Sequence, residues 1–207
     1  MKKRSGRMNR REFLKQSGVG SIALALPSLA PIVARPALDD EDGDEGRANF
    51  HVLSLSQGGV VDGVDHRIIM AGTGKFGPQH VTGGGSFTHF DGASPVPQTV
   101  LASGIWRAKR LISFTEEGEW GSQFISGMLE MTVILVAEFP SRAVVPATLL
   151  VNCNIGPAGL STGLPEGFFL TIEGAPFSPF EPATFPDTGF PFGLTLFTKG
   201  VRVREDD

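Results

Sequence analysis

The sequence of 207 residues contains one cysteine, Cys153, and no tyrosine. A single cysteine excludes an intrachain disulfide framework and a zinc site built from several thiolates. No run of 18 or more strongly apolar residues lies beyond the N-terminal region, which excludes a protein with several membrane-spanning helices. A chain of this length accommodates one ordinary domain plus an extension, with a core drawn from aliphatic residues and 16 phenylalanines.

The net charge of −4 is distributed unequally along the chain. Residues 1–37 carry eight Lys and Arg side chains against one acidic residue, Glu12, and the remaining 170 residues carry a net charge of −11. A domain with this charge repels nucleic-acid phosphates and anionic lipids. We therefore expect no nucleic-acid partner.

The basic N-terminal region contains a recognisable sorting pattern. Residues 9–15 read Asn-Arg-Arg-Glu-Phe-Leu-Lys, and the uncharged segment 16–34 that follows is interrupted by Pro27 and Pro31. This pattern resembles a twin-arginine translocation (Tat) signal, whose recognition residues match Arg10, Arg11, Phe13 and Leu14. The prolines make the segment a poor membrane anchor, so we expect no stable membrane insertion.

The resemblance implies that the twin-arginine export machinery is a partner and that the mature chain is periplasmic or extracellular. It also implies a cargo that folds before export, which agrees with the lone Cys153. We expect a signal peptide over residues 1–37. Met1 and Met8 both remain candidate initiators, and the cleavage site stays open.

Residues 38–46 contain six acidic side chains and one apolar side chain. Such a segment has too little apolar surface to offset the entropy lost on ordering, so 38–47 is predicted to be an acidic disordered linker. From residue 48 onward the apolar residues alternate with period two, and Gly, Pro, Asn or Asp separates nearly every apolar segment. The pattern predicts an all-β domain over 48–207, an antiparallel sandwich or barrel of about eight strands.

Three histidines, His66, His80 and His89, fall within 24 residues, with Asp65 and Asp91 beside two of them. Three imidazoles converging from adjacent strands are weak candidates for a metal site, although the spacing matches no known metal motif. The same histidines, joined by Arg107 or Glu130, are also candidates to line a barrel mouth. Metal content and catalytic residues both stay open at this point.

One apparent cofactor motif fails on its context. Gly72-Thr73-Gly74-Lys75-Phe76-Gly77 has the spacing of a dinucleotide-binding turn, but Pro78 follows at once and no helix can receive a pyrophosphate. We therefore expect no cofactor there and interpret the glycines as turn residues between strands. The segment 81–87 resembles, over less than a tenth of the chain, the Gly-Gly-x-Gly-x-Phe turn of dirigent and allene-oxide-cyclase-like eight-stranded barrels, departing from it at Ser86.

Two further segments have unusual composition. Residues 106–110 read Trp-Arg-Ala-Lys-Arg, which we interpret as a solvated strand face. Residues 175–192 hold five Pro and five Phe, and are predicted to cross the domain as a rigid loop outside any strand ladder, with the rings packed on the core. If several rings are exposed instead, they would suit a homo-oligomer.

These observations favour a binding or structural protein with an exported β-domain. The alternatives are an enzyme with a barrel pocket, of isomerase, cyclase or hydrolase type, or a metal-binding protein, both using His66, His80 and His89 with nearby carboxylates.

Overall fold

The computed structural model describes residues 48–96, 98–156 and 162–200. The described part of the chain is built from nine strands: β1 (Ala48–Val61), β2 (Val64–Phe76), β3 (Val81–Asp91), β4 (Val100–Trp120), β5 (Phe124–Phe139), β6 (Ala143–Cys153), β7 (Gly167–Thr171), β8 (Glu181–Pro182) and β9 (Gly193–Lys199). The predicted signal peptide (1–37) and acidic linker (38–47) lie outside the described residues. Within the described residues, no helix is long and apolar enough to cross a membrane.

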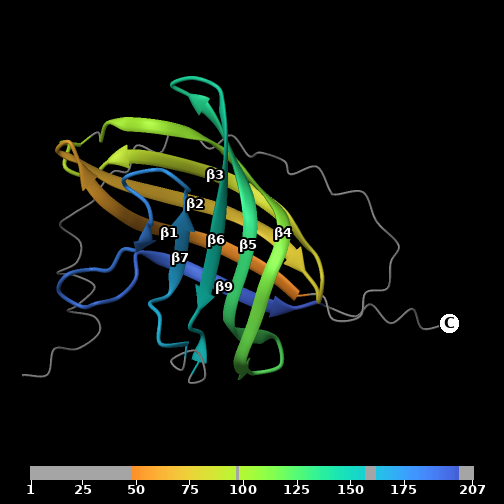
Figure 1. Ribbon diagram of the computed structural model, residues 1–207. Helices are drawn as coiled ribbons and strands as arrows, with labels where there is room; N and C mark the ends of the chain where they lie inside the picture. Colours follow the sequence, from red (N-terminus) through yellow and green to blue (C-terminus); the bar gives the residue numbers. More distant parts are fainter. Residues whose placement is uncertain (1–47, 97, 157–161, 201–207) are drawn as a thin grey trace, which may run out of the picture. The chain divides into compact units, whose positions relative to one another are not determined.

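All strand pairings are antiparallel, and six strands close into a ring (Figure 1). Strands β1 to β5 pair in chain order, and β9 closes the ring by pairing with both β1 and β5. β6 and β7 extend the sheet from β5, while the short β8 pairs with β1. The all-β antiparallel prediction is confirmed, with nine strands in place of about eight.

The core follows from the alternation of side chains along each strand. In β5, Leu129, Met131, Val133 and Leu135 are buried, and the residues between them face away from the core. Trp106 of β4 and Phe50 of β1 are fully buried, with ring centroids 6.3 Å apart. The largest fully buried side chains are Trp106, Phe50, Phe168, Phe180, Phe197, Ile68, Met70, Leu129, Met131, Leu149, Leu170 and Val133.

Cys153 lies at the end of β6, fully buried, as the apolar context of its sequence predicts. Burial raises the pKa of its thiol above the ordinary value. The thiol is therefore a structural component of the core and a poor nucleophile at neutral pH.

The glycines of the failed dinucleotide motif lie inside strands, which corrects their interpretation as turn residues. Gly72 and Gly74 belong to β2, and residues 83–85 belong to β3; only Gly77 lies at the turn between them. A Cβ atom on Gly72 would lie 2.4 Å from the Trp106 ring, and one on Gly74 would lie 2.4 Å from the Phe50 ring. The glycines therefore leave room in β2 and β3 for the buried rings of Trp106 and Phe50.

The Phe/Pro-rich segment 175–192 also departs from its prediction, because it takes part in strand pairing. β8 pairs with Ser56 and Gln57 of β1, and Phe180 forms a bridge to Leu170 of β7. The five rings differ in burial: Phe180 is fully buried, Phe177 and Phe192 are partly buried, and Phe185 and Phe190 are exposed. The homo-oligomer predicted through this segment stays a prediction.

Candidate functional site

Two of the three candidate histidines meet at one end of the barrel. His66 of β2 and His89 of β3 occupy the face of this hairpin that also carries Ile68 and Phe87. Their ring nitrogens, His66 Nδ1 and His89 Nε2, lie 2.9 Å apart, which is hydrogen-bond distance. One imidazole therefore donates this hydrogen bond through its N–H, and the other accepts it through an unprotonated ring nitrogen.

Phenylalanine rings from the segment after β7 cover the histidine pair. Phe177 stacks on His66, with ring centroids 4.3 Å apart and an interplanar angle of 17°. Phe177 also contacts His89 at 5.1 Å, and the edge of Phe180 meets the His89 ring at 5.6 Å. The backbone carbonyl of Phe177 accepts a hydrogen bond from the amide of Gly59, which ties this segment to β1.

The surroundings of the pair disfavour positive charge on His89. Burial, and secondarily the proximity of His66, lower the pKa of His89 to about 4. At neutral pH His89 is therefore an uncharged ring that carries one hydrogen-bond donor and one acceptor. Its Nε2 is engaged with His66, and its Nδ1 makes no hydrogen bond with the described residues.

His89 lines a cavity of about 370 Å³ inside this end of the barrel. Among the residues that line the cavity, His89 is the one titratable side chain and Ser141 the other polar one. The apolar lining residues come from β2 to β6, the β5–β6 turn and the segment after β7: Ile68, Phe87, Ala102, Leu135, Ala137, Phe139, Pro140, Ala143, Val145, Ile172, Ala175, Phe177 and Phe180. The volume and the lining are those of a small-molecule pocket with two hydrogen-bonding side chains.

The third histidine lies at the opposite end of the β2–β3 hairpin. His80 is exposed at the turn between the two strands, where its carbonyl accepts a hydrogen bond from Gly77. Within the part of the chain that the structure describes, no three His, Cys, Asp or Glu side chains are grouped closely enough to hold a metal ion. The three imidazoles proposed as metal ligands thus divide into a pair and a separate residue.

The carboxylates beside the histidines have other partners. Asp65 forms an ion pair with Arg67 at 2.7 Å, and Asp91 accepts hydrogen bonds from the backbone amides of Asp65 and Ala93. These contacts fix the end of the β2–β3 hairpin. The two acids therefore hold the strands that carry the histidine pair in position and make no hydrogen bond with the imidazoles.

Comparisons with protein-family models, with curated proteins and with solved structures all find no match. The site is therefore interpreted from its own geometry and chemistry.

Arg107 and Glu130 lie outside the pocket, which corrects their placement at the barrel mouth. Arg107 follows the buried Trp106 in β4, and Glu130 lies between the buried Leu129 and Met131 in β5. Alternation along a strand directs both side chains to the outer surface. Glu130 accepts a hydrogen bond there from the Ser113 hydroxyl.

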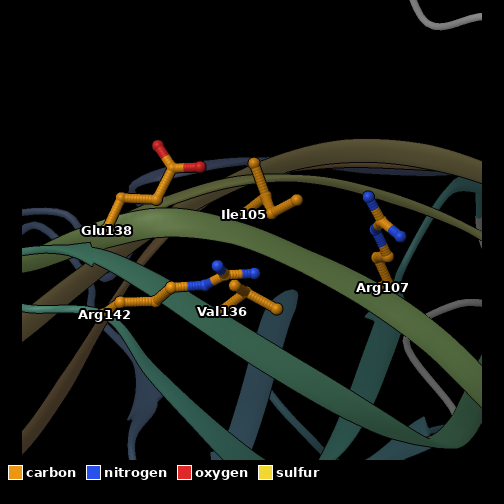
Figure 2. Close-up of a pocket in the computed structure, with 5 residues that line it drawn as sticks. All are labelled: Ile105, Arg107, Val136, Glu138 and Arg142. Atoms are coloured by element: carbon orange, nitrogen blue, oxygen red, sulfur yellow. The ribbon is translucent and has the colours of Figure 1, made fainter.

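Arg107 instead borders a second hollow, of about 450 Å³, on the outer face of β4 and β5 (Figure 2). Ile105, Val136, Glu138 and Arg142 complete its lining. Arg142 belongs to the turn between β5 and β6, 35 residues beyond Arg107 in the sequence. Sequence reasoning treated residues 106–110 as a solvated face and did not connect them with Arg142.

Sequence reasoning also missed Phe177 and Phe180 as lining residues of the histidine pocket. The sequence predicts only that these rings pack on the core. The prolines around them do not show which part of the core the rings face. The pairing of Glu181 and Pro182 with β1 determines that direction. A two-residue strand leaves no periodic signal in a sequence.

Proposed function

We propose that the β-domain is an exported binding protein that takes an apolar small molecule into the histidine pocket. The observation that carries this proposal is an apolar cavity of about 370 Å³ with two hydrogen-bonding side chains in its wall, the uncharged His89 and Ser141. An apolar body would fill the cavity, and a single hydroxyl or carbonyl group of the ligand would bond to the free nitrogen of His89. His66 acts as the positioning residue, because its hydrogen bond fixes the His89 ring.

The pKa of His89 favours binding over catalysis. A general base works best when its pKa lies near the operating pH, and a ring with a pKa of about 4 is a weak base at neutral pH. It remains a good hydrogen-bond partner in its uncharged form. The barrel-pocket enzyme is therefore the less well supported of the two functions.

Export through the twin-arginine route is the second part of the proposal. It rests on Arg10, Arg11, Phe13 and Leu14, which match the recognition residues of that signal. The mature domain would then meet its ligand in the periplasm or outside the cell.

The binding proposal is tested by titrating the purified protein with N-phenyl-1-naphthylamine, an uncharged apolar dye whose fluorescence rises in apolar surroundings. Ala143→Phe places a ring in the cavity from the solvent-exposed start of β6, which limits damage to the core. We expect saturable binding to the wild type and an affinity at least tenfold lower for this variant, because the ring occupies the ligand volume.

The matched control is Ala93→Phe, which adds the same ring at an exposed position outside the cavity. This variant should bind the dye within twofold of the wild type, and both variants should unfold cooperatively. Equal dye binding by the wild type and Ala143→Phe would place the dye elsewhere and contradict the proposal.

A further inference from the structure

The cationic side chains of the domain are concentrated on one outer face. The described residues include seven Lys and Arg side chains: Arg67, Lys75, Arg107, Lys109, Arg110, Arg142 and Lys199. Four of them, Arg107, Lys109, Arg110 and Arg142, are exposed on β4 and on the β5–β6 turn beside it. The same described residues carry twelve Asp and Glu side chains, so this cationic face stands out against a net negative surface.

These four cations lack carboxylate partners among the described residues. Arg67 pairs with Asp65, and Lys199 pairs with Glu119, but Arg107 and Arg142 form no ion pair with any described residue. Within the part of the chain that the structure describes, Arg142 has no ion pair, although Glu138 lines the same hollow. Both guanidinium groups are therefore available to an external anion.

The hollow between these arginines has an apolar floor. Figure 2 shows the Arg142 side chain extending along the sheet toward Val136, with Arg107 on the far side of Ile105 and Val136. Register assembles the floor, because Ile105 pairs with Val136 and Arg107 with Ile134 across β4 and β5. The site thus combines two planar donor groups with apolar contact area in a volume of about 450 Å³.

We propose that this hollow binds a small organic anion that carries one oxyanion head, such as a carboxylate, on an apolar body. Guanidinium groups match the planar geometry of such heads and bind them through paired hydrogen bonds. Ile105 and Val136 contact the apolar body. Glu138 at the rim repels a second negative charge, which disfavours a polyanion.

This site is separate from the histidine pocket. Ile105, Arg107 and Val136 lie on the outer face of the barrel wall, whereas the histidine pocket is lined by residues of the inner face such as Leu135. This proposal is therefore independent of the proposed binding of an apolar molecule in the histidine pocket. Ala143→Phe should leave the affinity of the hollow for an anion unchanged.

The test is a titration of the protein with benzoate, with the arginine Nε–Hε signals followed by NMR. Benzamide is the uncharged matched probe. We expect saturable shifts of the Arg107 and Arg142 signals with benzoate and at least tenfold weaker binding of benzamide, because the amide carries no charge. The double variant Arg107→Gln/Arg142→Gln should lose at least tenfold in benzoate affinity.

The charge-matched control is Lys109→Gln/Arg110→Gln, which removes two cations from the same face but outside the hollow. It should keep benzoate affinity within about twofold at equal ionic strength. An equal loss of benzoate affinity in both double variants would show that only the overall positive charge of this face matters. That result would contradict the proposed site. Binding to phosphatidylglycerol vesicles without any saturable benzoate shift would overturn the small-molecule assignment as well.

Discussion

At the scale of single residues, the histidine pair shows how an ionisable side chain is kept neutral. His66 and His89 share one hydrogen bond at 2.9 Å and are packed against Phe177. A charge on the His89 ring would lose hydration and face the His66 ring at close range. The His89 ring is therefore uncharged at neutral pH.

This neutrality predicts a pH dependence of stability. Unfolded His89 takes up a proton near pH 6.5, and folded His89 does so near pH 4. Between these values the unfolded state binds more protons, so the contribution of His89 to the free energy of unfolding is full above about pH 6.5 and declines as the pH falls toward 4. Urea unfolding at several pH values measures this change.

Carboxylates also titrate over part of this range, so the comparison is made with His89→Gln. The difference in unfolding free energy between the wild type and this variant should shrink as the pH falls from 7.5 to 4.5. The exposed His80→Gln serves as the control, because it removes an imidazole that lies outside the pocket. A constant difference for His89→Gln would contradict the prediction.

The candidate site was only partly predictable at this scale. Period-two alternation along a strand puts residues 87 and 89 on one face, and the structure has Phe87 and His89 on the same face of β3. The separation of His80 from the other two depends on where β2 turns into β3. That turn, at residues 77–80, fixes the register in which Ile68 pairs with His89.

At the scale of elements, β2 and β3 form a strand pair whose middle has almost no side chains. Gly72 and Gly74 pair with Gly85 and Gly83, and Trp106 and Phe50 pack against the bare backbone. The indole N–H of Trp106 also donates to the Ala71 carbonyl at 3.1 Å. Glycine normally weakens a strand, and here the packing of two large rings compensates for that weakness.

Gly72→Ala should therefore be strongly destabilising. The new Cβ would lie 2.4 Å from the Trp106 ring and 2.6 Å from the Gly84 carbonyl oxygen, and neither group can retreat within the core. We expect a loss of about 2–4 kcal/mol in the free energy of unfolding, measured by urea denaturation.

Gly59→Ala is the matched control, because its Cβ would have no atom nearer than 3.7 Å and the residue is exposed. Its free energy of unfolding should stay within about 0.5 kcal/mol of the wild type. Similar losses in the two variants would show that the backbone preference of alanine, rather than the packing of the Trp106 ring, determines the loss in free energy of unfolding.

At the scale of the whole molecule, the export hypothesis predicts that Arg10→Lys/Arg11→Lys abolishes transport. Lysine keeps the charge but lacks the planar fork of arginine, so recognition of the twin-arginine pair should fail. In a bacterial host with a twin-arginine translocase, we expect at least tenfold less protein outside the cytoplasm, measured by fractionation and immunoblotting.

Arg4→Lys/Arg7→Lys makes the same exchange outside the motif and should export normally. Unimpaired export of the Arg10/Arg11 variant would contradict the hypothesis. The two proposed ligand sites do not depend on export, so this outcome would not contradict the binding proposals.

The global fold could be predicted as a class but not as a connection pattern. The alternation of Leu129, Met131 and Val133 identifies a half-buried strand from the sequence alone. Ring closure depends on pairing between residues such as Phe50 and Phe197, nearly 150 positions apart, and no local pattern encodes such a contact. For the same reason, the sequence gives no sign that Arg107 and Arg142 border one hollow.

The pairing of β1 with β9 also sets the order of events in the cell. During synthesis β1 is among the first strands of the domain to be made, and its partner β9 is the last of the nine. Until β9 emerges from the ribosome, the ring has a gap, and β1 and β5 expose backbone groups that could pair with another chain. The ring therefore closes only after β9 has been translated, although β1 to β5 can pair in chain order before then.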